Sequence, residues 1–403
     1  MIMKKIKILP DEMVTKIAAG EVIERPASVV KELIENSYDA GAAAITVEIK
    51  KSGRELISVA DDGTGIGRED IATAAERHST SKISGIPDLE NITTFGFRGE
   101  ALPSIASIAE LKITSKADGE EPGTEIVLTG GRITQKRDAA VARGTTVEVK
   151  GLFGSIPARL KFLKSDTTEK NRIISCVTEY AVVNFHTSVR LICDGKELFF
   201  YPAANDLKTR LAQIFGAEFG RELLPVEGRH ADVSVFGFVS RPGKTFLSRN
   251  RTFTFANGRP VSSRPLVWAV KNGYGEFLRP GENPAIFLMV SVLPADIDVN
   301  VHPTKREIKF RNEEAVCSFI HQTVRSALLT AEAIPSIGLG AAGAKTGTAD
   351  FPSGQRREDG PSQPPAYENR RQSQDTAENI FVNSPKKAYE AQELANTGPT
   401  GPK

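Results

Sequence analysis

Apolar residues between positions 28 and 40 recur three and four places apart, which is the spacing of one face of an α-helix. The members of this stripe are Val29, Val30, Leu33 and Ile34. Pro26 suits the first turn of such a helix, and Gly41 suits the residue after its last turn. The pattern therefore predicts an amphipathic helix that packs one face against a core.

The segments after this helix have a different period. Residues 45–49 and 56–60 alternate apolar with polar side chains, which is typical of strands with one buried face. Residues 191–201 also have a strand-like pattern, and a helix is expected to begin near Leu207. This alternation of helices and strands predicts a mixed α/β fold, and we find no internal repeat of fixed period.

The length of 403 residues exceeds what one hydrophobic core usually supports, so we expect more than one domain. The change from strand to helix at residues 202–206 predicts one boundary. The sequence after Ile334 is rich in Gly, Pro, Ser, Gln and Asn, with equal numbers of acidic and basic residues, which predicts a flexible linker. We therefore expect a first domain at 1–203, a second at 204–333 and a disordered linker at 334–403.

Composition excludes several classes of protein. With 40% hydrophobic and 25% charged residues, and no apolar run near the ~20 residues of a membrane span, the chain is typical of soluble globular proteins. Pro10 and Asp11 interrupt the basic N-terminus before the apolar core of a signal peptide develops. Cys176, Cys193 and Cys317 suit a reducing compartment as small buried residues. We expect a cytoplasmic protein with no signal peptide and no membrane partner.

Net charge and two common phosphate-binding motifs give no direct indication of function. The formal charge is only +2, so any nucleic-acid contact must come from a local basic patch. Residues 63–67 read G-x-G-x-G, which is not the dinucleotide-binding fingerprint. Residues 237–245 have one residue too many between their glycines for a P-loop. Neither motif is therefore assigned.

The predicted helix at 28–40 carries two polar residues of chemical interest. Glu32 and Asn36 are four residues apart and so lie on the same helical face. A surface helix with a glutamate and an asparagine facing water would have the same pattern. A functional role is favoured by the sequence motifs that follow this helix along the chain.

Four further segments accompany it: 59–67 (VADDGTGIG), 77–82 (RHSTSK), 96–101 (GFRGEA) and 144–147 (GTTV). In this order and spacing they resemble the ATP-binding motifs of the GHKL superfamily, which includes type II topoisomerases, heat-shock chaperones and sensor kinases. The longer segments 17–37, 96–101 and 298–305 resemble the MutL family of DNA mismatch repair proteins, and this similarity covers residues 6–329. The resemblance implies a GHKL-type (Bergerat) ATP-binding α/β sandwich, followed by a smaller α/β domain.

The resemblance also implies roles at the two ends of a bound ATP. Glu32 is expected to act as the general base on the attacking water, and Asn36 to bind the Mg²⁺ that bridges the phosphates. Asp61 is expected to accept the adenine amino hydrogen, and Thr145 to hold the same base through its hydroxyl group. A carboxylate and an amide oxygen are chemically suited to the first two roles.

Glycines and a mobile segment are expected to surround the phosphates. Gly63 and Gly65 let the backbone approach the base. The turn formed by Gly96, Phe97, Arg98 and Gly99 opens a helix ending near Ala109, so its free amides would face the phosphates. Thr80 and Lys82 are expected to contact phosphate at the edge of a lid at 80–101.

The second half of the chain is expected to supply Lys305, which by resemblance reaches the γ-phosphate, although an exposed loop lysine is ordinarily only solubilising. ATP would then be sensed by both domains, and ATP binding would order the lid and the arm at 6–23 and pair two copies of the chain. The implied function is an ATP-driven clamp that couples a mismatch-recognition protein of the MutS type to downstream repair factors, close to the nucleoid.

DNA contact is expected to be non-specific and directed at the backbone, because no base-reading motif occurs. The candidate phosphate-binding residues are Arg159, Lys161, Lys164, Arg259 and Arg264, for which ordinary solvated surface charge is the alternative.

Two other functions share much of this pattern. A chaperone or topoisomerase subunit would use the same ATP motifs, and a binding module could use ATP only as a switch, although it would not need Glu32 as a base. Full-length MutL relatives continue into a dimerisation domain that in many of them is a metal-dependent endonuclease. We expect no such domain and no nuclease activity in this chain.

Overall fold

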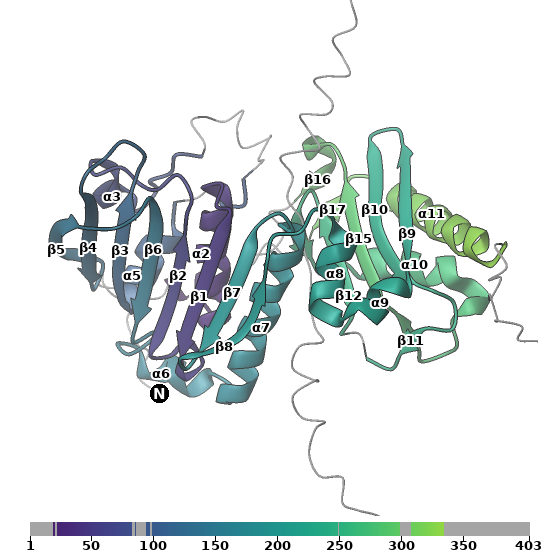
Figure 1. Ribbon diagram of the computed structural model, residues 1–403, viewed down its shortest axis with the longest axis horizontal. Coiled ribbons are helices and arrows are strands. Elements are labelled where there is room, and N and C mark those ends of the chain that lie inside the picture. Colours follow the sequence, from purple (N-terminus) through teal and green to yellow (C-terminus); the bar gives the residue numbers. More distant parts are fainter. Residues whose placement is uncertain are drawn as a thin grey trace, which may run out of the picture.

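The computed structural model describes residues 19–20, 22–82, 85, 94–96, 99–248, 250–298 and 308–333, and all statements about structure below concern these residues. Predictions for Phe97, Arg98 and Lys305, for the linker at 334–403 and for most of the N-terminal arm lie outside them. The described residues form two α/β units side by side, each built on one main sheet (Figure 1).

The first unit contains an eight-stranded sheet with the strand order β5-β4-β3-β6-β2-β1-β7-β8. Neighbouring strands are antiparallel except for β1 and β7, which are parallel. The strands are β1 (Ala44–Lys50), β2 (Leu56–Asp61), β3 (Glu110–Lys116), β4 (Gly123–Thr129), β5 (Arg132–Ala139), β6 (Gly144–Lys150), β7 (Ser188–Cys193) and β8 (Lys196–Tyr201). In β1 and β2 every second side chain is buried, as their sequence period predicts.

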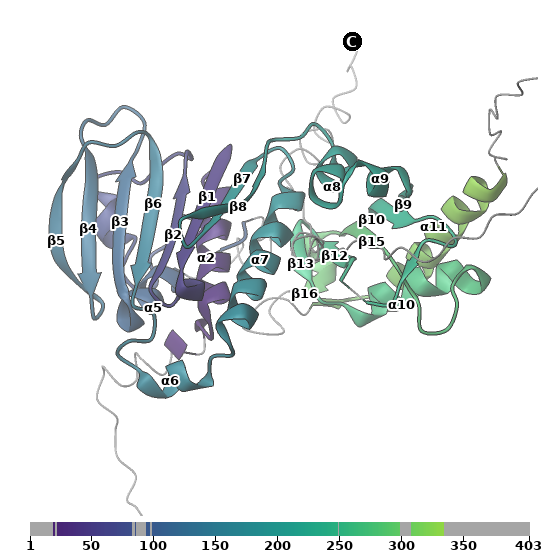
Figure 2. The same cartoon turned by 60° about the horizontal axis from the view of Figure 1, so that its bottom comes forward.

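Helices cover the buried face of this sheet, and α7 lies between the sheet and the second unit in both views (Figures 1 and 2). The helices of this unit are α2 (Pro26–Asp39), α3 (Asp70–Thr73), α5 (Ala101–Ile108), α6 (Pro157–Phe162) and α7 (Asp166–Val183), with a 3₁₀ turn, η1 (Lys51–Gly53). The predicted helix at 28–40 is confirmed as α2, and its apolar stripe is almost fully buried. The sheet and helices thus form the predicted sandwich.

The segment 191–201 is not one strand, as its pattern suggested, but the hairpin β7–β8. Asp194 and Gly195 connect the two strands with φ values of +51° and +77°. An Asp-Gly pair with two positive φ values is the favoured two-residue hairpin turn. The Asp-Gly pair is therefore the local sequence signal that divides the segment into two strands.

The second unit has a five-stranded sheet with the order β13-β12-β15-β10-β9 and two short two-stranded sheets. Its strands are β9 (Leu223–His230), β10 (Val233–Ser240), β11 (Thr245–Phe246), β12 (Thr252–Ala256), β13 (Arg259–Val261), β14 (Asn283–Pro284), β15 (Ile286–Ser291), β16 (Ile297–Asp298) and β17 (Lys309–Phe310). Its helices are α8 (Leu207–Phe215), α9 (Ala217–Arg221), α10 (Arg264–Tyr274) and α11 (Glu313–Ala333), with 3₁₀ turns η2 (Gly275–Phe277) and η3 (Pro294–Asp296). α10 and α11 enclose a separate apolar core on one face of this sheet.

The junction between the units is packed and buried. α8 begins at Leu207 as predicted, capped by Asp206, whose Oδ1 accepts from the Thr209 amide at 2.8 Å. The fully buried Arg210 of α8 donates to the carbonyls of Phe185, Thr187 and Pro202, at 2.8–3.0 Å. Helix α8 therefore contacts both units, and the domain boundary at 203/204 stays a prediction.

Two other sequence expectations can be compared with the fold. Cys176 and Cys193 are buried as free thiols, whereas Cys317 is only half-buried. Within the described ranges, no helix combines the length and the apolarity that crossing a bilayer requires.

Candidate functional site

Asp61 ends strand β2 opposite Thr145 of β6, at one edge of the sandwich. Its Oδ2 accepts a hydrogen bond from the Ser37 hydroxyl of α2 at 2.7 Å. Its Oδ1 accepts from the amides of Gly63 at 3.0 Å and Thr145 at 3.3 Å. Burial raises the pKa of Asp61, against the effect of these hydrogen bonds. A half-buried carboxylate is thus fixed in place by three donors from three elements.

Ser115 of β3 connects the neighbouring groups. Its hydroxyl lies 2.8 Å from the Thr145 hydroxyl and accepts from the Ile66 amide at 2.8 Å. Gly65 has a φ of +74°, and a Cβ there would approach the Lys116 carbonyl oxygen to 2.1 Å. The glycine is therefore required for the loop to close against β3. Ser37 and Ser115 were both missed from the sequence, because a serine in a helix or strand has no distinguishing pattern.

Glu32 lies on α2 beside an ion-pair network. The Lys31 ammonium donates to Glu32 Oε1 at 2.8 Å and to Glu35 Oε2 at 3.0 Å. Glu35 is buried and also accepts from the Tyr180 hydroxyl. Burial lowers the pKa of Lys31, but the carboxylates of Glu35 and Glu32 outweigh it and raise that pKa above its usual value. Lys31 is thus a fixed cation that orients the Glu32 carboxylate.

Asn36 lies one turn further along α2, at the centre of a second network. Lys82 donates from Nζ to Asn36 Oδ1 at 2.9 Å and to Asp39 Oδ2 at 2.6 Å. Asp39 also accepts from the backbone amides of Phe95 at 3.0 Å and Gly96 at 3.1 Å. The structure therefore brings together the predicted residues Asn36, Lys82 and Gly96. Asp39 was missed, although it is three residues from Asn36 on the same helical face.

Thr80 and Gly99 flank this network. The Thr80 hydroxyl accepts from the Lys82 amide at 3.1 Å. Gly99 has a φ of +60°, and a Cβ there would come within 2.3 Å of the Ser79 carbonyl oxygen. Helix α5 begins two residues later at Ala101 and ends at Ile108, close to the predicted end near Ala109.

The oxygen atoms around Lys82 are suited to a divalent cation. The ammonium group is shared between an amide oxygen of Asn36 and a carboxylate oxygen of Asp39, both of the kind that Mg²⁺ prefers. Over the described part of the chain, no cluster of three or more His, Cys, Asp or Glu could hold a metal by itself. This fits Mg²⁺ sites in which one or two side chains act together with substrate phosphates.

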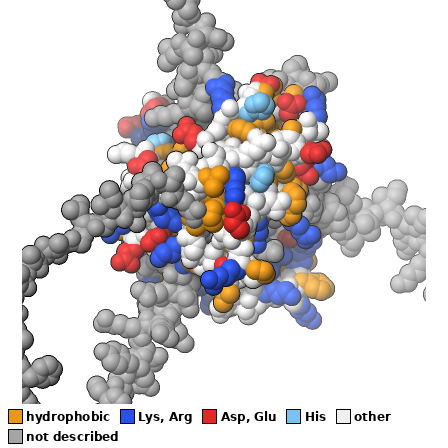
Figure 3. Space-filling model, turned by 90° about the vertical axis from the view of Figure 1, so that its right-hand side faces the viewer, with side chains coloured by type: hydrophobic (Ala, Val, Ile, Leu, Met, Phe, Trp, Pro, Cys, Tyr) orange, Lys and Arg blue, Asp and Glu red, His pale blue; other side chains and the backbone are white. Residues whose placement is uncertain are grey.

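The residues predicted to contact DNA lie in different environments. Lys161 and Lys164 are exposed at and just after α6, and Arg264 is exposed at the start of α10. Arg159 is half-buried, and its Nη1 lies 3.4 Å from the Ile23 carbonyl oxygen. At the α11 end of the molecule, acidic, basic and hydrophobic side chains are interspersed (Figure 3).

Arg259 is not available to DNA, and its predicted role is corrected. Its side chain is buried, and its two terminal nitrogens donate to the carbonyls of Phe95, at 3.0 Å, and of Thr94. A buried guanidinium whose donors are already used within the protein cannot bind a phosphate in solution. The sequence could not distinguish it from Arg264, because burial is set by the tertiary fold.

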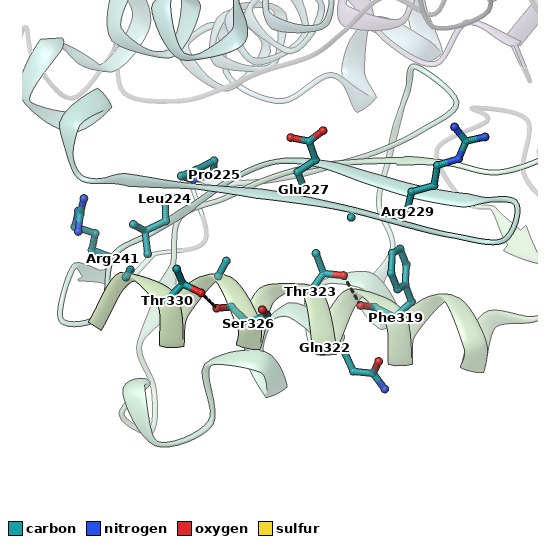
Figure 4. Close-up of a pocket in the computed structure, with 13 residues that line it drawn as sticks. Leu224, Pro225, Glu227, Arg229, Arg241, Phe319, Gln322, Thr323, Ser326 and Thr330 are labelled. Atoms are coloured by element: carbon teal, nitrogen blue, oxygen red, sulfur yellow. Dashed lines mark hydrogen bonds between the residues drawn. The ribbon is translucent and has the colours of Figure 1, made fainter. Parts of the chain in front are cut away.

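A groove of about 840 Å³ lies elsewhere, between β9 and α11 (Figure 4). Thr323 and Phe319 on α11 point toward β9, whereas the Glu227 and Arg229 side chains point away from α11. None of the residues with predicted roles lines this groove. The described residues that the sequence predicts to bind ATP therefore lie at the edge of the first sandwich and not in this groove.

Comparisons with known proteins agree with this arrangement. The family model described as histidine kinase-, DNA gyrase B- and HSP90-like ATPase matches residues 23–157. A second model, the C-terminal domain of DNA mismatch repair proteins, matches residues 211–329. The sandwich and the residues collected at its edge define a GHKL-type ATPase domain, followed by a second α/β domain.

Among curated proteins, the MutL mismatch repair protein of Opitutus terrae is 46% identical over 322 residues, which is 80% of this chain and 51% of that protein. MutL of Dictyoglomus thermophilum is 43% identical over 326 residues, 81% of this chain and 56% of that protein. Among solved structures, the Aquifex aeolicus MutL ATPase domain complexed with ADP is 30% identical with a TM-score of 0.54, covering 68% of this chain and 94% of the other.

The N-terminal domain of a DNA repair protein has a TM-score of 0.68 at 29% identity and covers 79% of this chain and 99% of the other. The chain belongs to the MutL family of DNA mismatch repair proteins. It spans about half the length of the curated relatives that it matches.

Proposed function

We propose that this chain binds ATP with Mg²⁺ at the edge of its first sandwich and hydrolyses it, and that it acts as an ATP-driven clamp in DNA mismatch repair. The single observation that carries the proposal is the half-buried Asp61 carboxylate at the end of β2, held by Gly63, Thr145 and Ser37. Ser37 lies on α2, the helix that also presents Glu32 and Asn36. An adenine acceptor and a candidate base on one rigid helix–strand unit can position both ends of one nucleotide.

The adenine end of the proposed site is Asp61, whose remaining lone pairs accept the base amino hydrogen, with Thr145 beside it. Glu32, whose carboxylate is oriented by Lys31, takes a proton from the attacking water. Asn36 would hold Mg²⁺, which supplies charge neutralisation for the phosphates when bound. Lys82 lies in the same region, and its ammonium suits phosphate oxygens. The Gly96 amide lies beside it and donates to Asp39.

Support for phosphate binding by Lys82 comes from its position. Its ammonium lies on Asn36 and Asp39, so a cation and the Lys82 ammonium compete for the same oxygens. A cation held there by Asn36 and Asp39 would free the Lys82 ammonium for the phosphates that it is proposed to contact. Lys305 is proposed to reach the γ-phosphate from the second domain, on the strength of the sequence resemblance alone.

The decisive experiment combines turnover with association. We expect the purified chain to hydrolyse ATP only with Mg²⁺, to be monomeric without nucleotide and to dimerise with a non-hydrolysable ATP analogue. Steady-state phosphate release and sedimentation velocity at several protein concentrations measure the two effects. A stable dimer without nucleotide, or a monomer at saturating analogue and high protein concentration, contradicts the clamp but not the ATPase.

The proposed repair role includes DNA, a mismatch-recognition protein of the MutS type and downstream repair factors. Arg264 is the favoured DNA contact because it is exposed at the first turn of α10, whereas Arg259 is buried. Contacts of this kind bind phosphate groups and not base edges, so sequence preference is expected to be absent.

We expect Arg264→Glu to weaken binding to every DNA sequence alike and to reduce any stimulation of turnover by single-stranded DNA. Fluorescence anisotropy with two unrelated sequences across a salt series measures this, because affinity that depends on counterion release falls steeply with salt. Glu276→Lys, a charge change elsewhere in the second domain, serves as a control. If the DNA affinity of the parent does not depend on salt, or if Arg264→Glu loses ATP binding, Arg264 does not belong to the DNA-binding surface.

A chaperone or topoisomerase subunit would use the same class of ATPase domain. Residues 211–329 match the mismatch repair model, which favours the repair function over both. The absence of nuclease activity remains a prediction.

A further inference from the structure

Arg259 begins strand β13 at a position fixed by a tight hairpin. Asn257 and Gly258, which connect β12 to β13, have φ values of +46° and +78°, as in the favoured two-residue turn. The Asn257 side chain donates to the Val292 carbonyl at 3.0 Å and accepts from the Val292 amide at 2.9 Å. The turn is thus pinned to the end of β15, and Arg259 projects from a rigid base.

The Arg259 guanidinium crosses from the second unit into the first. It is only 7% exposed, and its terminal nitrogens donate to the Phe95 carbonyl at 3.0 Å and to the Thr94 carbonyl. Its central carbon lies 5.9 Å from the centre of the Phe95 ring. A planar fork that reaches two successive carbonyls fixes both the position and the orientation of the segment it binds.

Asp39 holds the same three-residue segment from the opposite side. Its carboxylate accepts from the amides of Phe95 and Gly96, while Arg259 donates to the carbonyls of Thr94 and Phe95. The peptide groups therefore lie between an anion on the first domain and a cation on the second. Hydrogen bonds arranged in such a chain polarise and strengthen one another.

The consequence reaches the proposed phosphate end of the site. Gly96 has Lys82 and Asn36 as neighbours, since a Cβ on Gly96 would lie 3.1 Å from Lys82 Nζ and 3.6 Å from Asn36 Oδ1. Phe95 also packs in a buried aromatic cluster with Tyr38 and Tyr180, at ring-centre distances of 6.3 and 5.9 Å. A shift of Arg259 would thus move Gly96 relative to Asn36.

We infer that Arg259 is a positioning residue through which the second domain fixes the phosphate end of the nucleotide site, by way of Thr94–Gly96 and Asp39. This inference rests on the proposed ATPase function. It gives the second domain a contact with the site that is independent of Lys305, and it makes the geometry at Gly96 depend on how the two domains are packed.

The test is a double-mutant cycle on Mg·ATP turnover with Arg259→Gln and Asp39→Asn. We expect each single substitution to lower kcat by about ten- to hundredfold, as for a displacement on the order of 1 Å at a reacting centre. In the Asp39→Asn background, Arg259→Gln should lower kcat by less than about twofold more, because the shared segment is already released. Arg325→Gln is the matched control. That arginine forks onto Glu276 within the second domain, and its loss should leave kcat within about twofold.

Effects that multiply in the double variant indicate that Arg259 and Asp39 act independently, and they overturn the inference. So does an Arg259→Gln variant with the kcat of the parent. Absence of ATP hydrolysis by the parent contradicts the proposed function itself. A failure of the proposed function is thus distinguishable from a failure of the inference about Arg259. Thermal unfolding accompanies each measurement. Should Arg259→Gln not fold, Arg259→Lys decides: it keeps the charge but has no planar fork, so a several-fold lower kcat at an unchanged melting temperature supports the inference and parental kcat rejects it.

Discussion

Glu32→Ala is expected to abolish most of the ATP turnover while leaving nucleotide binding nearly intact. A positioned general base contributes about a hundredfold to ten-thousandfold to rate, and removing Glu32 should cost kcat in that range. Binding should persist because the contacts proposed for the adenine and phosphate ends come from other residues, among them Asp61 and Asn36. Single-turnover phosphate release and equilibrium binding of a fluorescent ADP measure the two quantities separately.

Two further variants sharpen this test. Glu32→Gln keeps the shape of the side chain and can still accept from Lys31, so equal losses in Gln and Ala variants identify proton transfer, and not packing, as the cause. Glu55→Ala removes an exposed carboxylate that pairs with Lys51, and it should leave kcat unchanged. Parental turnover in Glu32→Ala would remove Glu32 from the mechanism.

Asp61→Asn is expected to weaken nucleotide binding by about 10- to 150-fold. This corresponds to the loss of about 1.5–3 kcal/mol for a hydrogen bond to a charged group. The asparagine can keep its oxygen toward the amides of Gly63 and Thr145 and turn its amide nitrogen to the Ser37 hydroxyl, so the local structure survives. What is lost is the negative acceptor for the adenine amino group. Isothermal titration with Mg·ADP checks the loss.

The pH dependence of binding gives the same assignment a second test. Burial raises the pKa of Asp61, and only the ionised carboxylate accepts the adenine hydrogen. Nucleotide affinity should therefore not change with pH above this pKa, and it should fall by about tenfold per pH unit below it. Because the pKa of Asp61 is raised, this fall should start at a higher pH than for an exposed aspartate. The Asp61→Asn variant should lack this component.

The neighbouring Asp62 provides the matched control. Its carboxylate accepts from the amides of Ala43 and Ala44 and is exposed, so Asp62→Asn should bind Mg·ADP within about threefold of the parent. Equal losses in the two asparagine variants, or an acid dependence that persists in Asp61→Asn, would show that the base is recognised elsewhere.

The local elements of the site follow from sequence period and turn chemistry. Helix α2 and strands β1 and β2 lie where their apolar spacing predicts, because one buried face per element imposes a period of 3.6 or 2 on the chain. The hairpin at Asp194–Gly195 also has a local signal, because an Asp-Gly pair is the favoured two-residue turn, whereas the strand-like pattern of 191–201 does not separate β7 from β8. The motif residues came from resemblance, since a glutamate and an asparagine four places apart do not by themselves differ from a solvated helical face.

What the tertiary structure decided is which side chains meet and which are buried. By itself, the sequence determined an α/β chain with an apolar stripe on α2, a set of polar residues at 32, 36, 61, 80, 82 and 145, and a glycine at 96. It contained no sign that Asp39 accepts hydrogen bonds from Lys82 and from the amides of Phe95 and Gly96. It also did not show that Ser37 bonds to Asp61 and Ser115 to Thr145. Nor could it separate Arg259 from Arg264, which are five positions apart and are each followed directly by a proline. The physical reason is that local propensity depends on neighbours along the chain, whereas burial and hydrogen-bond partners depend on groups brought together from distant segments: 164 residues separate Arg259 from Phe95.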